Sequence, residues 1–278
     1  MLKVILFTTL ASFSFLFSDG NDPSDVSVNE YEWQLTFEDQ FDAVDRSKWI
    51  FKHDNGVQTI WSNKELQWYK EENVVAEGGV LKLIAKKESV YGKDTESEKQ
   101  FEFSSGMICN SKSFTQPYGK WEMKVRFPFG KGFWPAFFLV PVQRPTLPEV
   151  DVFEYFGVAP NDMTCTLHYG TDYFNPPMKM IDGQAKPFYF KKTKTFNGDF
   201  ADRWMVWICE IYPNKIVWKL DGNIVFESTE GIPTAPMYMI ANVAVKDYPE
   251  NDRKVDESKL PYVMEIDYVK IYKMVPKN

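Results

Sequence analysis

The sequence predicts an all-β protein built as an antiparallel β-sandwich. Three observations support this fold class: apolar and polar residues alternate with period two in several segments, turn-forming residues separate these segments, and long helical periodicity is missing. The chain has 278 residues, of which 44% are hydrophobic, so it can bury a sizeable core. Aromatic residues make up 17%, which suits either the packed faces of large sheets or an aromatic-lined binding groove.

The N-terminal segment has the features of a signal peptide. Lys3 precedes an uncharged apolar run from Val4 to Phe17, and small residues follow at Ser18-Asp19-Gly20. The run is too short to span a bilayer, and no other run is long enough, so we expect no membrane span. We expect export to the periplasm, the cell surface or the medium, with three regions along the chain: a signal peptide at 1–20, a short leader at 21–30 and a single domain at 31–275.

Strands and turns then follow in order along the predicted domain. The clearest period-two segments are residues 81–85, 121–127, 216–220 and 262–272. Turn signals lie at residues 77–79, 117–119, 129–132, 197–199 and 221–223. Asp221-Gly222 joins two apolar runs and predicts a β-hairpin. Residues 61–71 form the one stretch that we expect to contain a helical turn.

The composition excludes several classes of function. A net charge of −7, from 32 Lys and Arg against 39 Asp and Glu, lacks the basic footprint of a nucleic-acid binder. The two histidines, His53 and His168, are too few for a multi-histidine zinc site. Cys109, Cys165 and Cys209 are widely spaced and form no CxxC pair. We expect them to be buried core residues, with one disulfide and an odd thiol as the alternative.

Three acids gather in one apolar segment. Glu149, Asp151 and Glu154 lie within six residues of a β-branched and aromatic run, where unpaired charge is costly to bury. On a regular strand Glu149 and Asp151 point the same way, whereas Glu154 points to the other face. A single-residue bulge at residues 152–153 would restore the parity, so we predict a bulge that places all three carboxylates on one face.

Crowded carboxylates have a chemical consequence, because repulsion keeps one ionised while another holds its proton near neutral pH. That pairing is what double displacement at a sugar's anomeric carbon requires. The spacing alone leaves two alternatives open, a site for a hard cation and a solvated strand face.

The same residues carry a resemblance to a known family. The segment Glu149–Glu154 resembles the E-[ILV]-D-x-x-E signature of glycoside hydrolase family 16, in the bulged form of laminarinases and several marine galactanases. Further segments resemble the family in the same order, namely residues 37–41, 63–69, 79–83, 118–122, 132–137 and 264–272. The resemblance spans about residues 31–273 and implies a concanavalin-like β-jelly-roll sandwich with a substrate cleft across its concave sheet.

The resemblance also implies roles for individual residues. Glu149 matches the nucleophile, Glu154 the general acid/base and Asp151 the assisting carboxylate of a retaining mechanism, which needs no cofactor for catalysis. The residues that match sugar-binding or cleft positions are Asn63, Trp134, His168 and Trp61. For Trp134 and His168 the alternative is an ordinary core residue.

A structural calcium ion is a further implication of the resemblance. The matching positions are Glu38, the backbone carbonyl of Gly79, and Asp267, all of which offer the oxygen ligands that a hard cation prefers. The alternative is that the two acids are ordinary exposed residues near strand ends.

The chain departs from the family pattern at three places. Phe138 stands where a second cleft tryptophan is common, and residues 204–207 lack a usual histidine. After Asn242, residues 243–248 read Val-Ala-Val-Lys-Asp-Tyr where a Gly-Gly turn is usual. None of these is a catalytic acid, so the departures bear on substrate choice.

The resemblance implies a monomeric, secreted, retaining endo-glycoside hydrolase whose partner is a polysaccharide. Laminarin-type β-1,3-glucan or mixed β-1,3/1,4-glucan is the expected substrate. The alternatives are a β-galactanase acting on agar, porphyran, carrageenan or a host glycan, a transglycosylase, and a non-catalytic carbohydrate-binding protein.

Overall fold

The computed structural model describes most of the chain beyond residue 30. The described residues are 31–93, 98–142, 147–157, 159, 161–170, 178–181, 184–187, 189–247 and 254–277. The predicted signal peptide (1–20) and leader (21–30) lie outside them. Among the described residues, none of the helices has the length and apolar character that crossing a membrane requires.

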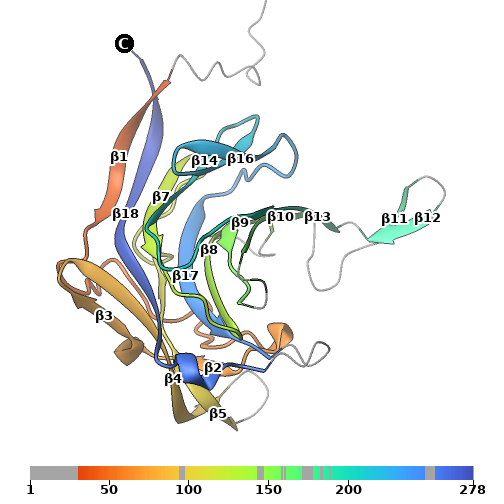
Figure 1. The fold of residues 1–278 in the computed structure, drawn as a ribbon. Coiled ribbons are helices and arrows are strands. Elements are labelled where there is room, and N and C mark those ends of the chain that lie inside the picture. Colours follow the sequence, from red (N-terminus) through yellow and green to blue (C-terminus); the bar gives the residue numbers. More distant parts are fainter. Residues whose placement is uncertain are drawn as a thin grey trace, which may run out of the picture.

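Two large β-sheets form the two layers of a sandwich (Figure 1). The first sheet has ten strands, ordered β16 (Asn223–Ser228), β15 (Ile216–Leu220), β14 (Met205–Ile211), β7 (Gly119–Arg126), β18 (Tyr262–Pro276), β4 (Val80–Lys93), β5 (Glu98–Ser105) and β2 (Gln67–Tyr69), with β1 (Tyr31–Asp39) beside β18 and β3 (Val74–Glu77) beside β4. The second sheet has six, ordered β13 (Tyr189–Asn197), β10 (Asp162–Gly170), β9 (Glu149–Glu154), β8 (Phe133–Pro141), β17 (Met237–Val245) and β6 (Met107–Cys109).

The remaining elements are small. Strands β11 (Met178–Ile181) and β12 (Gln184–Pro187) pair with each other, and the 3-10 helices are η2 (Trp61–Asn63), η3 (Glu71–Asn73) and η5 (Glu257–Lys259). Strand β2 pairs with β5 in parallel, and the other strand pairings in the described part are antiparallel. The predicted all-β antiparallel sandwich is confirmed.

The period-two segments lie in β4, β7, β15 and β18, as predicted. In β7, buried and half-buried residues alternate along the whole strand, because one face meets the core and the other meets solvent. The predicted hairpin joins β15 to β16, with Asp221 at φ 49° and Gly222 at φ 82°, the left-handed values that a two-residue hairpin turn needs. Residues 61–71 contain only the short η2 and the first residue of η3 as helical turn, with β2 between them.

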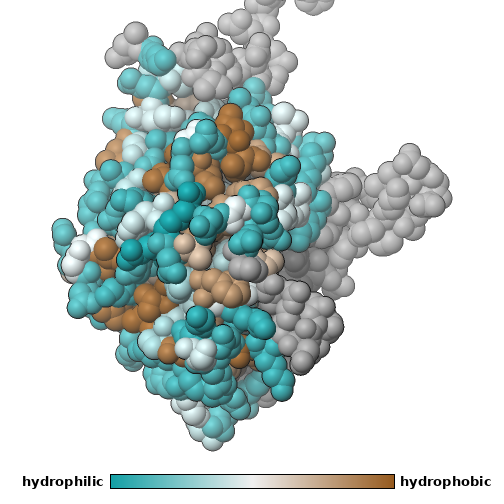
Figure 2. Space-filling model, in the orientation of Figure 1, coloured by the Kyte–Doolittle hydropathy of each residue, from teal (hydrophilic) through white to brown (hydrophobic). Residues whose placement is uncertain are grey.

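Aromatic side chains fill the space between the two sheets. Trp121, Trp207 and Trp218 from the ten-stranded sheet are fully buried, and Phe153 of β9 packs on Trp207 with ring centroids 5.4 Å apart. The aromatic content therefore serves core packing first. The view in Figure 2 shows a surface dominated by hydrophilic residues, with apolar ones gathered in separate patches. Cys109, Cys165 and Cys209 are buried and free, which confirms their core role and makes the disulfide alternative wrong.

Strand β17 is buried along its entire length, because segments cover both of its faces. One face contributes to the main core. Beside the other, Leu66 donates its N–H to Val245 O at 2.8 Å, and Val245 donates its own N–H to Gln67 Oε1 at 2.7 Å. Asn242 Nδ2 lies 2.5 Å from the hydroxyl of Tyr69. These bonds fix the segment between η2 and β2 against the six-stranded sheet, where the candidate site lies.

Candidate active site

A β-bulge on β9 places the three predicted acids on one face. Asp151 pairs with Thr166 of β10, but Glu154, three residues on, pairs with Thr164, only two residues away. The pairing with β8 shifts at the same place. One extra residue therefore lies at positions 152–153, and the predicted bulge is confirmed. It turns Glu154 to the side of Glu149 and Asp151.

Groups from both sheets satisfy the backbone of the bulge. Trp218 of β15, in the opposite sheet, donates its indole N–H to the carbonyl of Asp151 at 2.9 Å. The thiol of Cys165 on β10 donates to the carbonyl of Val152 at 3.2 Å. Bulged carbonyls lose regular ladder partners, and burying them unpaired would be costly. Sequence reasoning missed both donors, because no local pattern shows which side chain reaches β9.

The three acids line one pocket of about 360 Å³. Asn63, Trp134 and His168, which were predicted from the sequence, line the same pocket. Trp61 begins η2, and its side chain lies outside the described part of the chain. The structure thus brings six of the seven predicted catalytic and sugar-binding residues together, while their chemical roles stay predictions. The pocket residues that sequence reasoning did not assign to the site include Glu65, Thr164, Lys191, Asn242 and Lys246.

Burial dominates the electrostatics of the three acids on β9. It raises the pKa of Glu149, Asp151 and Glu154 well above their ordinary values. The charge of Asp151 raises the pKa of Glu149 and Glu154 further, whereas the positive charge of Lys191 lowers the pKa of Asp151 and Glu154. The three acids therefore do not all ionise near neutral pH, so the pocket can hold a proton donor beside an anionic carboxylate.

His168 stands beside the central acid. Its Nε2 lies 3.2 Å from Asp151 Oδ2, and both side chains are buried. Burial lowers the pKa of His168, so the imidazole stays neutral near pH 7. Ligand atoms of Glu149, Asp151 and His168 lie within 4.8 Å of one another, so this trio has a geometry that can also hold a divalent cation.

Glu65 is a fourth acid of the pocket; it is buried and holds Asn63 in place. Its carboxylate accepts hydrogen bonds from Ile60 N at 2.9 Å, Gln67 Nε2 at 2.7 Å and Asn63 Nδ2 at 3.3 Å. Burial raises the pKa of Glu65 to about 7. Because one amide hydrogen of Asn63 is engaged here, the amide has a defined orientation. The sequence signal that could have identified Glu65 is its position two residues after Asn63.

Trp134 is less open than a simple stacking platform. Its ring centroid lies 4.9 Å from that of Phe156, and the Nζ of Lys246 lies 5.4 Å from it. The indole is half-buried and lines the pocket. Trp134 therefore lies in the pocket, as expected for a cleft residue, and one part of its ring also packs against Phe156, as expected for a core residue.

The predicted calcium ligands have lysine partners. The Nζ of Lys270 lies 3.4 Å from Glu38 Oε1, and that of Lys124 lies 2.7 Å from Asp267 Oδ2. Gly79 occupies the turn between β3 and β4 with φ 74°. These ion pairs favour the reading of both acids as ordinary strand residues, and a calcium ion at this place stays a prediction.

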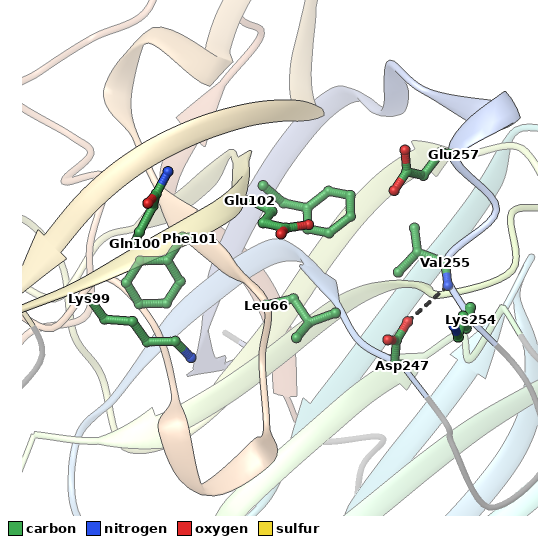
Figure 3. Close-up of a pocket in the computed structure, with 10 residues that line it drawn as sticks. Leu66, Lys99, Gln100, Phe101, Glu102, Asp247, Lys254, Val255 and Glu257 are labelled. Atoms are coloured by element: carbon green, nitrogen blue, oxygen red, sulfur yellow. Dashed lines mark hydrogen bonds between the residues drawn. The ribbon is translucent and has the colours of Figure 1, made fainter.

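A second pocket, of about 440 Å³, has a different character (Figure 3). Its acids are held by partners: Asp247 accepts the N–H of Val255 at 2.9 Å, and Glu102 and Glu257 both pair with Lys87, at 3.0 and 2.8 Å. Figure 3 shows the three acids on separate segments, with Asp247 bonded to the backbone of Val255. This pocket therefore lacks the crowded acids that the pocket at β9 offers for chemistry.

Comparisons with known proteins identify relatives of the chain. The family model described as glycosyl hydrolases family 16 matches residues 55–270. Glucan endo-1,3-beta-glucosidase A1 of Niallia circulans is 26% identical over 92% of the chain, and the Beta-glucanase of Rhodothermus marinus is 27% identical over 92%. The chain spans 41% of the first relative's length and 90% of the second's. The solved structure of the laminarinase from Rhodothermus marinus superposes with a TM-score of 0.72 at 24% identity, covering 88% of this chain and 99% of that one, and shows the same fold.

Proposed function

Because the chain belongs to glycosyl hydrolases family 16, we propose that it is a secreted, retaining endo-hydrolase of laminarin-type β-1,3-glucan, with mixed β-1,3/1,4-glucan as a related substrate. The observation that carries the proposal is the bulged β9, which gathers Glu149, Asp151 and Glu154 in one pocket. The relatives named as a glucan endo-1,3-beta-glucosidase and a Beta-glucanase support the choice of a β-glucan.

The first chemical step uses two of the acids. The ionised carboxylate of Glu149 attacks the anomeric carbon of the bound sugar, while protonated Glu154 delivers its proton to the departing glycosidic oxygen. The bond between carbon and leaving oxygen breaks with its electron pair going to that oxygen, and an ester forms between Glu149 and the sugar.

Glu154 then acts as a base in the second step. It accepts a proton from a water molecule, whose oxygen attacks the same anomeric carbon and displaces the carboxylate of Glu149. Two inversions at one carbon give net retention. The raised pKa of Glu154 suits both tasks, because the group must hold a proton before the first step and after the second.

Asp151 acts on the nucleophile. The negative charge of an ionised Asp151 raises the pKa of Glu149. When Asp151 holds a proton, this repulsion is absent, and Glu149 can be the ionised carboxylate that attacks. Neutral His168, whose Nε2 lies 3.2 Å from Asp151 Oδ2, places a polar group beside the central acid without adding a charge.

The pocket walls bind the polysaccharide. The amide of Asn63, oriented by Glu65, offers hydrogen bonds to sugar hydroxyls, and Trp134 offers part of its indole to the apolar face of a sugar ring. The N-terminal apolar run supports export, which brings the enzyme, acting as a monomer, to a polymer outside the cell.

Release of reducing ends from laminarin, lichenan, agarose, porphyran and carrageenan tests the substrate. We expect laminarin to be cleaved to oligosaccharides of several lengths from the start, as internal cleavage requires. Cleavage of only the galactans would replace the glucan with the β-galactanase alternative, and products longer than the substrate in the presence of added acceptor would indicate transglycosylation.

Glu149→Ser tests the mechanism. We expect turnover to fall by at least about three orders of magnitude, because no ester intermediate can form, while binding of laminarin-derived oligosaccharides persists. Turnover at the wild-type level would exclude Glu149 as the nucleophile, and binding by a wild-type protein that cleaves none of the polymers would indicate a non-catalytic carbohydrate-binding protein.

A further inference from the structure

Two lysines line the active-site pocket on opposite sides of the catalytic acids. Lys191 lies on β13, and Lys246 directly follows β17. In the order β13-β10-β9-β8-β17, one strand separates each of these strands from β9. Two strand spacings correspond to about 10 Å, so each lysine is anchored about that far from the strand of the acids. The pocket thus carries one cation on each side of its acidic centre.

Lys191 belongs to the row of the nucleophile. It pairs in register with His168, which in turn pairs with Glu149. Its side chain is exposed and, within the described part of the chain, forms no ion pair. The next residue, Lys192, instead pairs with Glu230 at 3.1 Å. The charge of Lys191 therefore acts on the pocket, where it lowers the pKa of Asp151 and Glu154.

Lys246 is fixed at the other side. Its N–H donates to Gly132 O at 2.8 Å, which holds the backbone, and its Nζ lies 5.4 Å from the ring centroid of Trp134. Its charge lowers the pKa of Glu65. Lys246 lies in the segment where the family pattern has a Gly-Gly turn, so this chain adds a long cationic side chain to that wall of the pocket.

A neutral glucan does not explain this arrangement. It offers hydroxyl groups and apolar ring faces, for which the pocket already supplies Asn63 and Trp134. The ammonium group of a lysine is strongly hydrated, and it loses bound water when it contacts a ligand. A neutral sugar hydroxyl compensates for this loss with an ordinary hydrogen bond. An anionic oxygen compensates with a charge-assisted hydrogen bond, which is about twice as strong. Carboxyl groups occupy the centre of the pocket and offer an anion no positive charge, whereas the two lysines beside them do.

We propose that Lys191 and Lys246 each bind an anionic substituent, a sulfate ester or a carboxylate, on a sugar of the bound chain, so that the preferred substrate is an anionic β-glucan. The inference rests on the proposed function, because it requires a glucan chain to cross the same pocket. It assigns two specificity positions, one on each side of the cleavage point, and leaves the reaction itself unchanged.

The test compares three polymers of one backbone: laminarin, lightly sulfated laminarin and lightly carboxymethylated laminarin. We expect the full-length enzyme to show a higher kcat/KM on at least one anionic polymer than on laminarin, and the advantage to shrink as NaCl rises from 50 to 500 mM. In Lys191→Gln and Lys246→Gln the ratio of anionic to neutral kcat/KM should fall about tenfold each, mainly through KM. The matched control Lys192→Gln, whose lysine pairs with Glu230, should keep the wild-type ratio.

The outcomes separate the two proposals. A higher kcat/KM on the sulfated than on the carboxymethylated polymer identifies the substituent as a sulfate ester, and the reverse order identifies it as a carboxylate. Equal or better cleavage of neutral laminarin at every salt concentration overturns the anionic substrate while the glucanase function stands. A wild-type ratio in both lysine variants also overturns it, and would mean that the two cations only offset the charge of the acids. Failure to cleave any of the three polymers would overturn the glucanase function itself.

Discussion

Glu65 provides a quantitative test of how strongly this pocket desolvates its acids. The side chain is 2% exposed, and burial raises its pKa from 4.5 to about 7 although three hydrogen bonds and the charge of Lys246 oppose the rise. Because the folded pKa lies above the unfolded one, the favourable contribution of this group is complete below pH 4.5 and is lost as the pH rises to about 7. This rise in the pKa of Glu65, from 4.5 to about 7, corresponds to about 3 kcal/mol of unfolding free energy.

The perturbation is Glu65→Gln, which cannot ionise. Its absolute effect on stability includes altered hydrogen bonds with Ile60, Asn63 and Gln67, but these do not change with pH. The unfolding free energy of the variant minus that of wild type should therefore become more positive by about 3 kcal/mol between pH 4 and pH 8.5. Equilibrium urea unfolding at both pH values, followed by tryptophan fluorescence, measures this difference.

The control and the refuting result are both definite. Glu227→Gln, at an exposed acid of β16, should follow the pH dependence of wild type within error. If the difference between Glu65→Gln and wild type is the same at pH 4 and pH 8.5, Glu65 is not desolvated, and the argument that burial controls this pocket is wrong. Glu65→Gln should also raise KM more than it lowers kcat, because it disturbs the orientation of Asn63.

Three further predictions concern the catalytic centre. Lys191→Gln should move the alkaline limb of the kcat/KM profile to higher pH, because the lysine charge holds down the pKa of Glu154; an unmoved limb in a pH-rate series would contradict this. Trp218→Phe removes the donor to the Asp151 carbonyl, so the free energy of unfolding in urea should fall by about 1–3 kcal/mol. The variant should also have a lower kcat with little change in KM. An unchanged kcat would mean that the bulge does not need this bond. Treatment with EDTA should leave kcat at 25 °C unchanged, because the proposed mechanism uses carboxylates alone. Activity that is lost and then restored by a divalent cation would favour a metal between Glu149 and Asp151.

The predictable part of this fold is the part that repeats locally. Alternation identifies β4 and β7, because one face of each strand meets the core and the other meets solvent. The bulge on β9 is predictable by a different route: three acids can share one face only if an extra residue corrects the parity between Asp151 and Glu154. In this case the spacing of the acids predicted a β-bulge, and the shifts in the pairing of β9 with β10 and β8 confirmed it.

The supporting contacts are not predictable in this way. Trp218 lies 67 residues from Asp151 in the chain and belongs to the other sheet. Its place in the apolar β15 predicts that it is buried, but not that it donates to the Asp151 carbonyl. The lysine partners of Glu38 and Asp267 depend on the strand register, which turns these acids toward Lys270 and Lys124. Periodicity says which face a side chain occupies, but not which neighbour it meets.

These contacts explain why the site needs both layers of the sandwich. The bulge gives Glu154 its direction, but it leaves carbonyls of Asp151 and Val152 without regular partners at the boundary of the core. Trp218 reaches across from the ten-stranded sheet to one carbonyl, and Cys165 reaches the other from the neighbouring strand. Since the same packing excludes water from the acids and raises their pKa values, one set of buried side chains fixes the geometry of the catalytic row and also sets its protonation. A change in the core behind β9 should therefore alter kcat and the pH profile together, whereas a change at the exposed Lys191 alters the profile and leaves the bulge intact.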